Sequence, residues 1–306
     1  MKIYIAGHRG LVGSAIVRQI EKGSQHVFIG QTRAELDLLD RSAVFSYLAK
    51  EKPDAVIIAA AKVGGIQANN SYPVEFLSQN LQIETNLLDG AHAAGIDRVL
   101  FLGSSCVYPK FAQQPIKEEY LLTGELEKTN EAYARAKITG RQRVQAYRSH
   151  SGHRWISAMP TNMYGPGDNF DLENSHVLPA LIRKFHDAKV SGASSVTLWG
   201  SGSPKREFLH ADDLGSACLF LLENYDNDIA INVGVGEDVS IKELAEVIKK
   251  ITGFEGSIEW DASKPDGTPR KLLDVSRLSD LGWKATISLE DGISSTYLWY
   301  QENQKV

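Results

Sequence analysis

Cysteine, positive charge and long hydrophobic runs are all scarce in this sequence. Its 306 residues include two cysteines, Cys106 and Cys218, whose wide separation gives neither a metal-binding spacing nor a disulfide framework. The formal net charge of −5 leaves no basic excess for holding a nucleic-acid backbone. No run approaches the roughly 18 apolar residues that span a membrane, and the opening MKIYIAG lacks the features of a signal peptide. We therefore expect a cytoplasmic protein with no metal, nucleic acid or membrane among its partners.

The first 160 residues alternate between short β-rich runs and longer helical segments. Near-continuous apolar strands are typical of a parallel sheet covered on both faces, and helices supply the crossovers that parallel strands need. The expected strands are Lys2–Ala6, Val27–Gly30, Ala55–Ala59, Arg98–Leu102 and Trp155–Met159. The main helices expected between them are Leu11–Lys22, Arg41–Lys50, Val74–Ala94 and Ala132–His150. The pattern predicts an α/β fold with a doubly wound parallel sheet of the Rossmann type.

The pattern is less regular after Pro160. Residues 161–175 are rich in Asn, Gly, Pro and Asp, which is typical of an irregular loop that faces a ligand. Further helices and strands are expected at Val177–Ala188, Val196–Trp199, Ala211–Asn224, Ile229–Val233, Ile241–Thr252 and Leu289–Glu302. We expect residues 1–160, with returning segments near 205–235, to form a dinucleotide-binding domain. Residues 161–306 would form mainly a smaller carboxy-terminal lobe for the substrate.

A glycine-rich turn joins the first expected strand to the first helix. Gly7, Gly10 and Gly13 have the spacing G-x-x-G-x-x-G in AGHRGLVGSAI. Such glycines permit a tight turn, a close approach of the backbone to a pyrophosphate, and close packing of the helix on the strand. The amino end of the helix then offers N–H groups to the phosphates. A tight turn without a ligand is the alternative, but the position directly after the strand favours a dinucleotide site.

Charges near this turn favour NADP over NAD as the cofactor. An NAD enzyme commonly has an acidic residue after the second strand, whereas here the tripeptide QTR follows it. Arg9 and Arg33 could together clamp a 2′-phosphate, with two solvated surface arginines as the alternative. Asp40 is a candidate contact to the adenine edge, or equally a cap for the helix that follows it.

Tyr133 and Lys137 lie four residues apart, on one face of an expected helix. An ammonium beside a phenol favours the phenolate, which brings the phenol nearer to acid–base chemistry. The fourth strand ends in LFLGSSCVYP, where strand alternation places Ser104 and Cys106 on one side and turns Ser105 away. These four side chains form a candidate catalytic centre.

His176 precedes an expected helix, because Pro179 fits only into a first turn. A helix amino terminus disfavours the imidazolium, which keeps this histidine usable as a base. Cys106 and His176 are residue types that titrate near neutral pH and can move protons. A small core residue and a helix-end hydrogen-bonder are the respective alternatives. Cys218, in the apolar segment SACLFLL, is expected to be in the core.

Longer strings carry a resemblance to a known family. The glycine turn, the strand-end serine and the Tyr–Lys pair together resemble the extended short-chain dehydrogenase/reductases. More specific are the strings GHRGLVGSAI, AAAKVGGIQANN, GSSCVYPK, MPTNMYGP, NSHVLPAL, GSGSPKREFLH and DASKPDGTPRKLLD. They resemble the GDP-L-fucose synthase family over essentially the whole chain. The resemblance implies an NADPH-dependent 3,5-epimerase and 4-reductase acting on GDP-4-keto-6-deoxy-D-mannose.

The resemblance also implies roles for single residues. Ser104, Tyr133 and Lys137 would form the reductase centre, and Cys106 and His176 the acid/base pair that epimerises the carbons beside the ketone. The contacts expected for the cofactor are Gly7, Arg9, Gly10, Gly13, Arg33, Asp40, Lys137, Asn162 and His176. Those expected for the nucleotide part of the substrate are Lys184, Trp199, Arg206, Asp266, Arg270 and Lys271. A homodimer is also implied, in which the two longest helices of each copy form a four-helix bundle.

Other activities remain compatible with these motifs. Close relatives of the family act on the 3-deoxy sugar as GDP-L-colitose synthases. A nucleotide-sugar epimerase or dehydratase without net reduction would share the fold, although a dehydratase usually has an acid pair where Ser105 and Cys106 stand here. An NADP-sensing regulator would keep the glycine turn but typically loses the Tyr–Lys pair, which this chain retains.

Overall fold

Six parallel strands form the central sheet of the computed structural model, which describes residues 1–264 and 266–303. Their order is β10-β5-β4-β3-β1-β2, and each neighbouring pair is parallel. Because β1 lies between β2 and β3, the strand order reverses direction at β1. Ligands of such sheets bind beside this point, at the carboxyl ends of the strands. The strands are β1 (Lys2–Ala6), β2 (Val27–Ile29), β3 (Ala55–Ile58), β4 (Arg98–Leu102), β5 (Arg154–Pro160) and β10 (Ile231–Val233).

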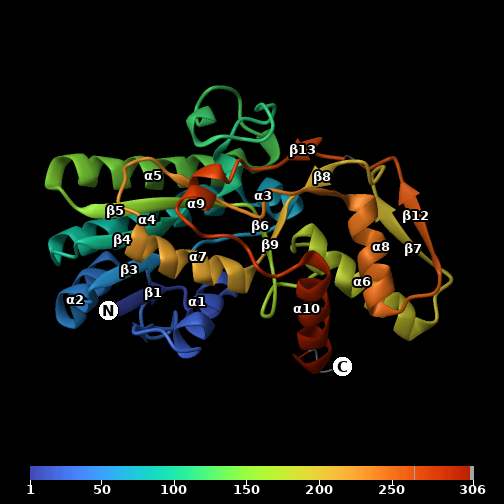
Figure 1. Ribbon diagram of the computed structural model, residues 1–306, viewed down its shortest axis with the longest axis horizontal. Helices are drawn as coiled ribbons and strands as arrows, with labels where there is room; N and C mark the ends of the chain where they lie inside the picture. The colour runs from blue at the N-terminus through green and yellow to red at the C-terminus, as the bar shows by residue number, and fades with distance from the viewer. Residues whose placement is uncertain (265, 304–306) are drawn as a thin grey trace.

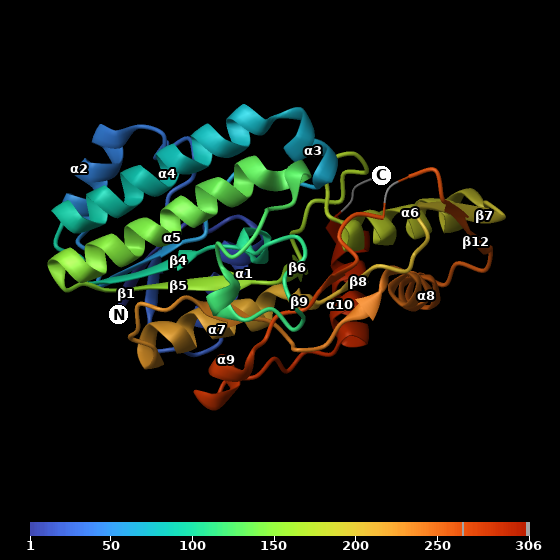
Figure 2. The ribbon, with the colours of Figure 1, turned by 90° about the horizontal axis from the view of Figure 1, so that it is seen from above.

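Helices cover both faces of this sheet (Figure 1, Figure 2). Alternate residues of β1 explain this: Ile3 and Ile5 join one apolar cluster, whereas Tyr4 and Ala6 join a second cluster on the other face. A strand buried on both faces reads as an unbroken apolar run, and the predicted doubly wound α/β fold is confirmed. On one face lie α2 (Arg41–Glu51), α4 (Pro73–Ala93) and α5 (Glu131–Ser151), and on the other α1 (Leu11–Glu21) packs against α7 (Ala211–Asn224).

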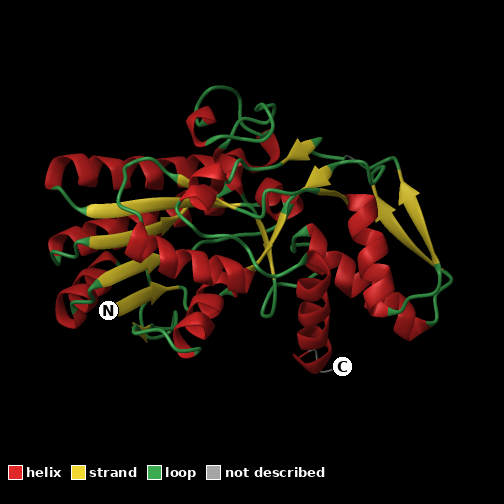
Figure 3. Ribbon diagram, viewed as in Figure 1, coloured by secondary structure: helices red, strands yellow, loops and turns green. Residues whose placement is uncertain are grey.

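A smaller group of elements lies beside the large sheet (Figure 3). The strands β7 (Ser195–Trp199) and β12 (Ser257–Asp261) pair in parallel, and α6 (Val177–Ser191), α8 (Ile241–Thr252) and α10 (Leu289–Asn303) pack around a separate apolar cluster. Helix α8 has strong end signals: Ser240 and Glu243 form a reciprocal capping box, and Gly253 ends the helix at φ +68°. Within residues 1–264 and 266–303, no helix combines the length and apolarity needed to cross a membrane.

The sequence pattern does not predict several short elements. The segment 161–175, expected to be irregular, contains β6 (Asn162–Tyr164), which pairs in parallel with β9 (Phe208–His210). Elements this short show no reliable period, so pairing with distant segments decides them. The other unpredicted elements are β8 (Lys205–Arg206), β11 (Val239–Ser240), β12, β13 (Arg270–Lys271), α3 (Ile66–Ser71), α9 (Ser276–Asp280), and the 3-10 turns η1 (Ser105–Val107), η2 (Glu118–Tyr120) and η3 (Lys128–Asn130).

The buried carboxylate of Glu207 ties these short strands together. Its Oε1 accepts a hydrogen bond from the N–H of Val235 at 2.7 Å, and its Oε2 accepts one from Leu273 at 3.1 Å. Burial raises the pKa of Glu207, while the backbone hydrogen bonds act in the opposite direction. Strand β13 then pairs with β8, which places Lys271 beside Arg206. Two cations from distant segments are thereby brought to one place.

Candidate active site

The glycine-rich turn after β1 has a shape that fits a pyrophosphate. Gly7 has φ +87°, and a Cβ there would lie 2.8 Å from the backbone N of Ala60. A Cβ on Gly13 would overlap the backbone O of Gly7, so α1 can begin against the turn because position 13 has no side chain. Gly10 is the N-cap of α1, and no side chain of the described residues caps it. The amino end of this helix is therefore available to a phosphate.

The rim of the turn is positively charged. Arg9 and Arg33 are both exposed, as a clamp for a 2′-phosphate requires. A nearby carboxylate, Glu35, was not anticipated from the sequence; it accepts hydrogen bonds from the N–H and hydroxyl of Thr32, each at 2.8 Å, and these bonds lower its pKa. Asp40 caps α2 through its Oδ1, which is one of its two predicted roles. The turn and both arginines fit a dinucleotide that carries a 2′-phosphate.

The turn after β4 brings hydroxyl and thiol groups to the site. Ser104 and Cys106 are partly exposed whereas Ser105 is buried, as the strand alternation predicts. The Ser104 Oγ accepts a hydrogen bond from the N–H of Cys106 at 3.2 Å, which holds this turn in place. Ser104 also hydrogen-bonds Tyr133 on α5, so the three side chains lie together. A substrate carbonyl placed here would meet two hydroxyl donors and one thiol.

Lys137 has a partner that the sequence did not reveal. Its Nζ lies 2.9 Å from Oε1 of Glu84 on α4, and both side chains are buried. Burial raises the pKa of Tyr133, the charges of Cys106 and Glu84 raise it further, and the hydrogen bond with Ser104 acts to lower it. The effect of Lys137 on the phenol stays a prediction, because its ammonium is paired with Glu84 in this structure. The ammonium is balanced by Glu84, and the phenol keeps its proton.

His176 and Cys106 approach the same cation. His176 is the N-cap residue of α6, as Pro179 in the first turn predicts. Burial lowers the pKa of His176, and the ammonium of Lys271 lowers it further, so the ring is neutral near pH 7. The Nζ of Lys271 lies 3.5 Å from Sγ of Cys106. Lys271, which the sequence suggested only as a diphosphate ligand, thus contacts Cys106 and acts electrostatically on His176.

Four of the residues predicted to bind the nucleotide part of the substrate lie near the end of β7: Lys184, Trp199, Arg206 and Asp266. The Nζ of Lys184 lies 5.8 Å from the ring centroid of Trp199, whose side chain is exposed. Asp266 accepts hydrogen bonds from the N–H and hydroxyl of Ser201 at 2.7 and 2.8 Å. Burial lowers the pKa of Arg206, and the charge of Asp266 acts in the opposite direction. An exposed ring beside cations suits a purine and its phosphates.

Comparisons with known proteins agree with this geometry. The model of the NAD dependent epimerase/dehydratase family matches residues 3–234. The chain belongs to this family. It is 58% identical over 302 residues to GDP-L-fucose synthase 1 of Arabidopsis thaliana, covering 99% of this chain and 94% of that protein. It is 43% identical over 302 residues to GDP-L-colitose synthase of Yersinia pseudotuberculosis, covering 98% of each.

A solved structure is similar over the same span. A GDP-L-fucose synthetase from Naegleria fowleri bound to NADP superposes on this epimerase/dehydratase family member with a TM-score of 0.91. The two chains are 30% identical, and the match covers 99% of this chain and 94% of the other. The fold therefore extends to the segment after residue 234, which contains Asp266 and Lys271.

Asn162 and Arg270, two further predicted site residues, also have protein partners in this epimerase/dehydratase chain. The Nδ2 of Asn162 donates to the backbone O of Glu207 at 2.8 Å, which joins β6 to the segment before β9. The Nε of Arg270 donates to Asp238 at 2.6 Å. Both side chains therefore stabilise short strands near the site. Their contact with a ligand stays a prediction.

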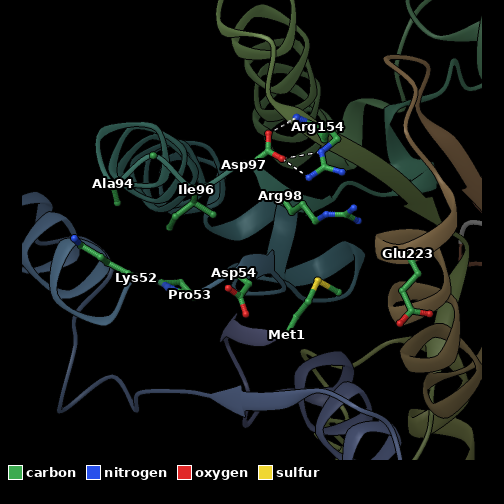
Figure 4. A pocket seen from close by; sticks show the side chains of 11 residues that line it. Met1, Lys52, Pro53, Asp54, Ala94, Ile96, Asp97, Arg98, Arg154 and Glu223 are labelled. Atoms are coloured by element: carbon green, nitrogen blue, oxygen red, sulfur yellow. Dashed lines mark hydrogen bonds and ion pairs between the residues drawn. The ribbon is translucent and has the colours of Figure 1, made fainter.

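A cavity of about 700 Å³ lies elsewhere on this family member (Figure 4). It is lined by residues at the amino ends of the strands, among them Asp54, Arg98 and the ion pair of Asp97 with Arg154. In the part of the chain that the structure describes, it contains none of the predicted site residues. Ligands of doubly wound sheets bind at the carboxyl ends instead, so this cavity is not the candidate active site.

Proposed function

We propose that the chain converts GDP-4-keto-6-deoxy-D-mannose to GDP-L-fucose, as an NADPH-dependent 3,5-epimerase and 4-reductase. The observation that carries the proposal is that Ser104 and Tyr133 lie near Cys106, whose Sγ is 3.5 Å from Nζ of Lys271, while the charge of Lys271 also acts on His176. Hydroxyl donors for a carbonyl oxygen thereby lie beside two groups that can move protons on carbon. The names of the Arabidopsis and Naegleria proteins support the choice of substrate.

The glycine turn and its arginines are the proposed cofactor site. The backbone at Gly7 and Gly13 would approach the pyrophosphate, and Arg9 and Arg33 would hold the 2′-phosphate. Lys137 would bind the ribose next to the nicotinamide. When bound, NADPH supplies the hydride that reduces C4 of the sugar. The NADP-bound Naegleria structure supports this choice of cofactor.

The epimerase half follows from the acidity of C–H bonds beside a ketone. Removing a proton from C3 or C5 leaves the electron pair on the C4 oxygen as an enolate. Ser104 and Tyr133 donate hydrogen bonds to that oxygen and stabilise its charge. Inversion then requires one group to take the proton and a second to return one to the opposite face. We assign these two roles to Cys106 and His176 as a pair.

The reductase half needs a proton for the C4 oxygen. Tyr133 is suited to give it, because burial raises the pKa of its phenol and keeps it protonated. The O–H bond of Tyr133 breaks as the C4 alkoxide takes the proton, and the phenolate that remains lies near the ammonium of Lys137. Solvent protons restore the phenol between turnovers.

Oxidation of NADPH in the presence of two GDP-sugars tests the proposal. We expect faster oxidation with GDP-4-keto-6-deoxy-D-mannose than with its 3-deoxy counterpart. The reverse preference would make the chain a GDP-L-colitose synthase. Binding of NADPH without oxidation with either sugar would overturn the reductase, and would leave an epimerase without net reduction or an NADP-sensing regulator.

We also propose a homodimer that forms through α4 and α5. These helices have 21 residues each and pack side by side on one face of the sheet (Figure 2). Two such pairs would pack as a four-helix bundle around a two-fold axis. Light scattering during size-exclusion chromatography should give twice the mass of one chain, and a monomer would contradict the proposal. The cytoplasmic location stays a prediction from the sequence.

A further inference from the structure

Glu84 lies in the middle of α4 and belongs to none of the motifs that identify the site. Its carboxylate nevertheless meets the ammonium of Lys137, with 2.9 Å between Oε1 and Nζ. The side chains are 1% and 2% exposed, so water does not screen the pair. A buried ammonium needs a partner of opposite charge or it loses its proton. Glu84 is therefore the partner that balances the charge of Lys137.

The residues packed around Glu84 and Lys137 leave space for both charged groups. The Nζ of Lys137 lies 4.9 Å from the ring centroid of Phe101 on β4 and 5.9 Å from that of Tyr133. Gly140, almost one turn after Lys137 on α5, has no side chain where the carboxylate lies. A Cβ on Gly140 would come within 2.7 Å of Oε2 of Glu84. The contact between α4 and α5 thus leaves room for one carboxylate, and the aromatic rings confine the ammonium.

The charges around Tyr133 show what this carboxylate does. Among the described residues, the titratable and charged groups facing the pair are Tyr133 and Arg143 on α5 and Cys106 on η1. Burial raises the pKa of Tyr133, and the charges of Cys106 and Glu84 raise it further. Burial also raises the pKa of Glu84, while the ammonium of Lys137 acts to lower it. Lys137 without Glu84 would act in the opposite direction and favour the phenolate. A phenolate could not give a proton to the C4 alkoxide.

We propose that Glu84 is a positioning residue of the reductase centre, which holds Nζ of Lys137 and balances its charge so that Tyr133 keeps its proton until the alkoxide forms. This inference rests on the proposed function. In the reduction step, the O–H bond of Tyr133 breaks and an O–H bond forms at the C4 oxygen. No proton passes through Glu84. The carboxylate acts entirely through Lys137 and Tyr133.

The substitution Glu84→Gln tests this role because it keeps the shape of the side chain and removes its charge. We expect kcat for reduction to fall about tenfold or more, with little change in KM for the GDP-sugar. The alkaline limb of the pH profile should move to lower pH, because the unbalanced ammonium favours the phenolate. Deuterium exchange beside the ketone without NADPH should fall less than reduction does, because Ser104 still donates a hydrogen bond to the enolate oxygen. Glu75→Gln, the same substitution near the start of α4, is the matched control.

Two further measurements keep the test decisive. NADPH binding without sugar, followed by its fluorescence, should weaken about threefold to tenfold in Glu84→Gln, because Lys137 is no longer held toward the ribose. This result can be read even if the wild type reduces no GDP-sugar, an outcome that would refute the proposed function alone. If Glu84→Gln does not fold, Glu84→Asp replaces it in the test. This variant keeps the negative charge but moves the carboxylate away from Nζ of Lys137. It should lower kcat while the alkaline limb stays near its wild-type position.

Three results would overturn the role of Glu84. One is a Glu84→Gln enzyme with wild-type kcat and pH profile. Another is a variant whose reduction and deuterium exchange fall together with its melting temperature, which indicates a purely structural ion pair. The third is a Glu84→Asp enzyme with wild-type kcat.

Discussion

The Nζ of Lys271 lies 3.5 Å from Sγ of Cys106, although 165 positions separate the two residues in the chain. The register of β13 with β8 places Arg206 next to Lys271, and the charge of Arg206 also interacts with Cys106. The fold therefore surrounds this thiol with positive charge.

Lys271→Gln should slow the alkylation of Cys106 by iodoacetamide near pH 7 by about fivefold, because the variant removes the ammonium that lies 3.5 Å from the sulfur. Cys218 is fully buried, so alkylation of the native protein reports on Cys106. Lys271→Arg keeps the charge and should react like the wild type. The matched control is Lys205→Gln, which removes an exposed cation from β8. Unchanged alkylation in Lys271→Gln would show that the contact has no chemical effect.

Arg33→Ala should weaken the binding of NADPH by roughly tenfold to a hundredfold and leave NADH binding nearly unchanged. The reason is the loss of a charge-assisted contact to the 2′-phosphate, which NADH lacks. Fluorescence titration with both cofactors measures the difference, with the exposed Lys50→Ala as a control for overall charge. Equal losses for the two cofactors would contradict the clamp.

Tyr133→Phe should reduce the rate of NADPH oxidation by about a hundredfold or more while NADPH still binds. The variant loses the proton donor for C4 and one donor to the enolate oxygen. Its ring and the edge contact with Phe76 remain, so the fold should be unaffected. Stopped-flow kinetics and a binding titration separate the two effects. Near-normal turnover would make the Tyr–Lys pair structural.

Cys106→Ser should separate epimerisation from reduction. In D2O without NADPH, the wild type should incorporate deuterium beside the ketone, because the enolate can form without hydride. A serine hydroxyl is far less acidic than a thiol, so the variant should lose this exchange. With NADPH it should still reduce C4 and give mainly a product that is not inverted. NMR of the sugar protons checks both outcomes, and exchange at the wild-type rate would exclude Cys106 from proton transfer.

His176 should make the folded protein less stable in mild acid. Burial and Lys271 lower the pKa of His176 in the folded state, whereas the pKa of an unfolded histidine is about 6.5. Below that pH the unfolded chain binds more protons than the folded one, so the free energy of unfolding decreases as the pH falls. Urea unfolding between about pH 7 and pH 5 should show a smaller decrease for His176→Asn. Equal slopes would mean that His176 does not contribute.

The sequence by itself determined the elements that carry a local signal. The helices Ala211–Asn224 and Ile241–Thr252 agree with the prediction at both ends. Their apolar faces repeat over several turns, so the period of a helix can be read from the sequence. The glycine turn could be read because its three glycines are close in the chain. The partial exposure of Ser104 and Cys106 and the burial of Ser105 followed from strand alternation. Such features depend on neighbouring residues and need no knowledge of the fold.

The tertiary structure alone decided which charges meet. Glu84 carries no motif, and it pairs with Lys137 because α4 and α5 pack side by side with Gly140 at their contact. Lys271 reaches Cys106 because β13, a strand of two residues, pairs with β8. Pairings of this kind join segments far apart in the chain, and their energy depends on burial and on distance through space. Periodicity along the sequence contains neither quantity, so the charge balance at Tyr133 and Cys106 could not be predicted from it.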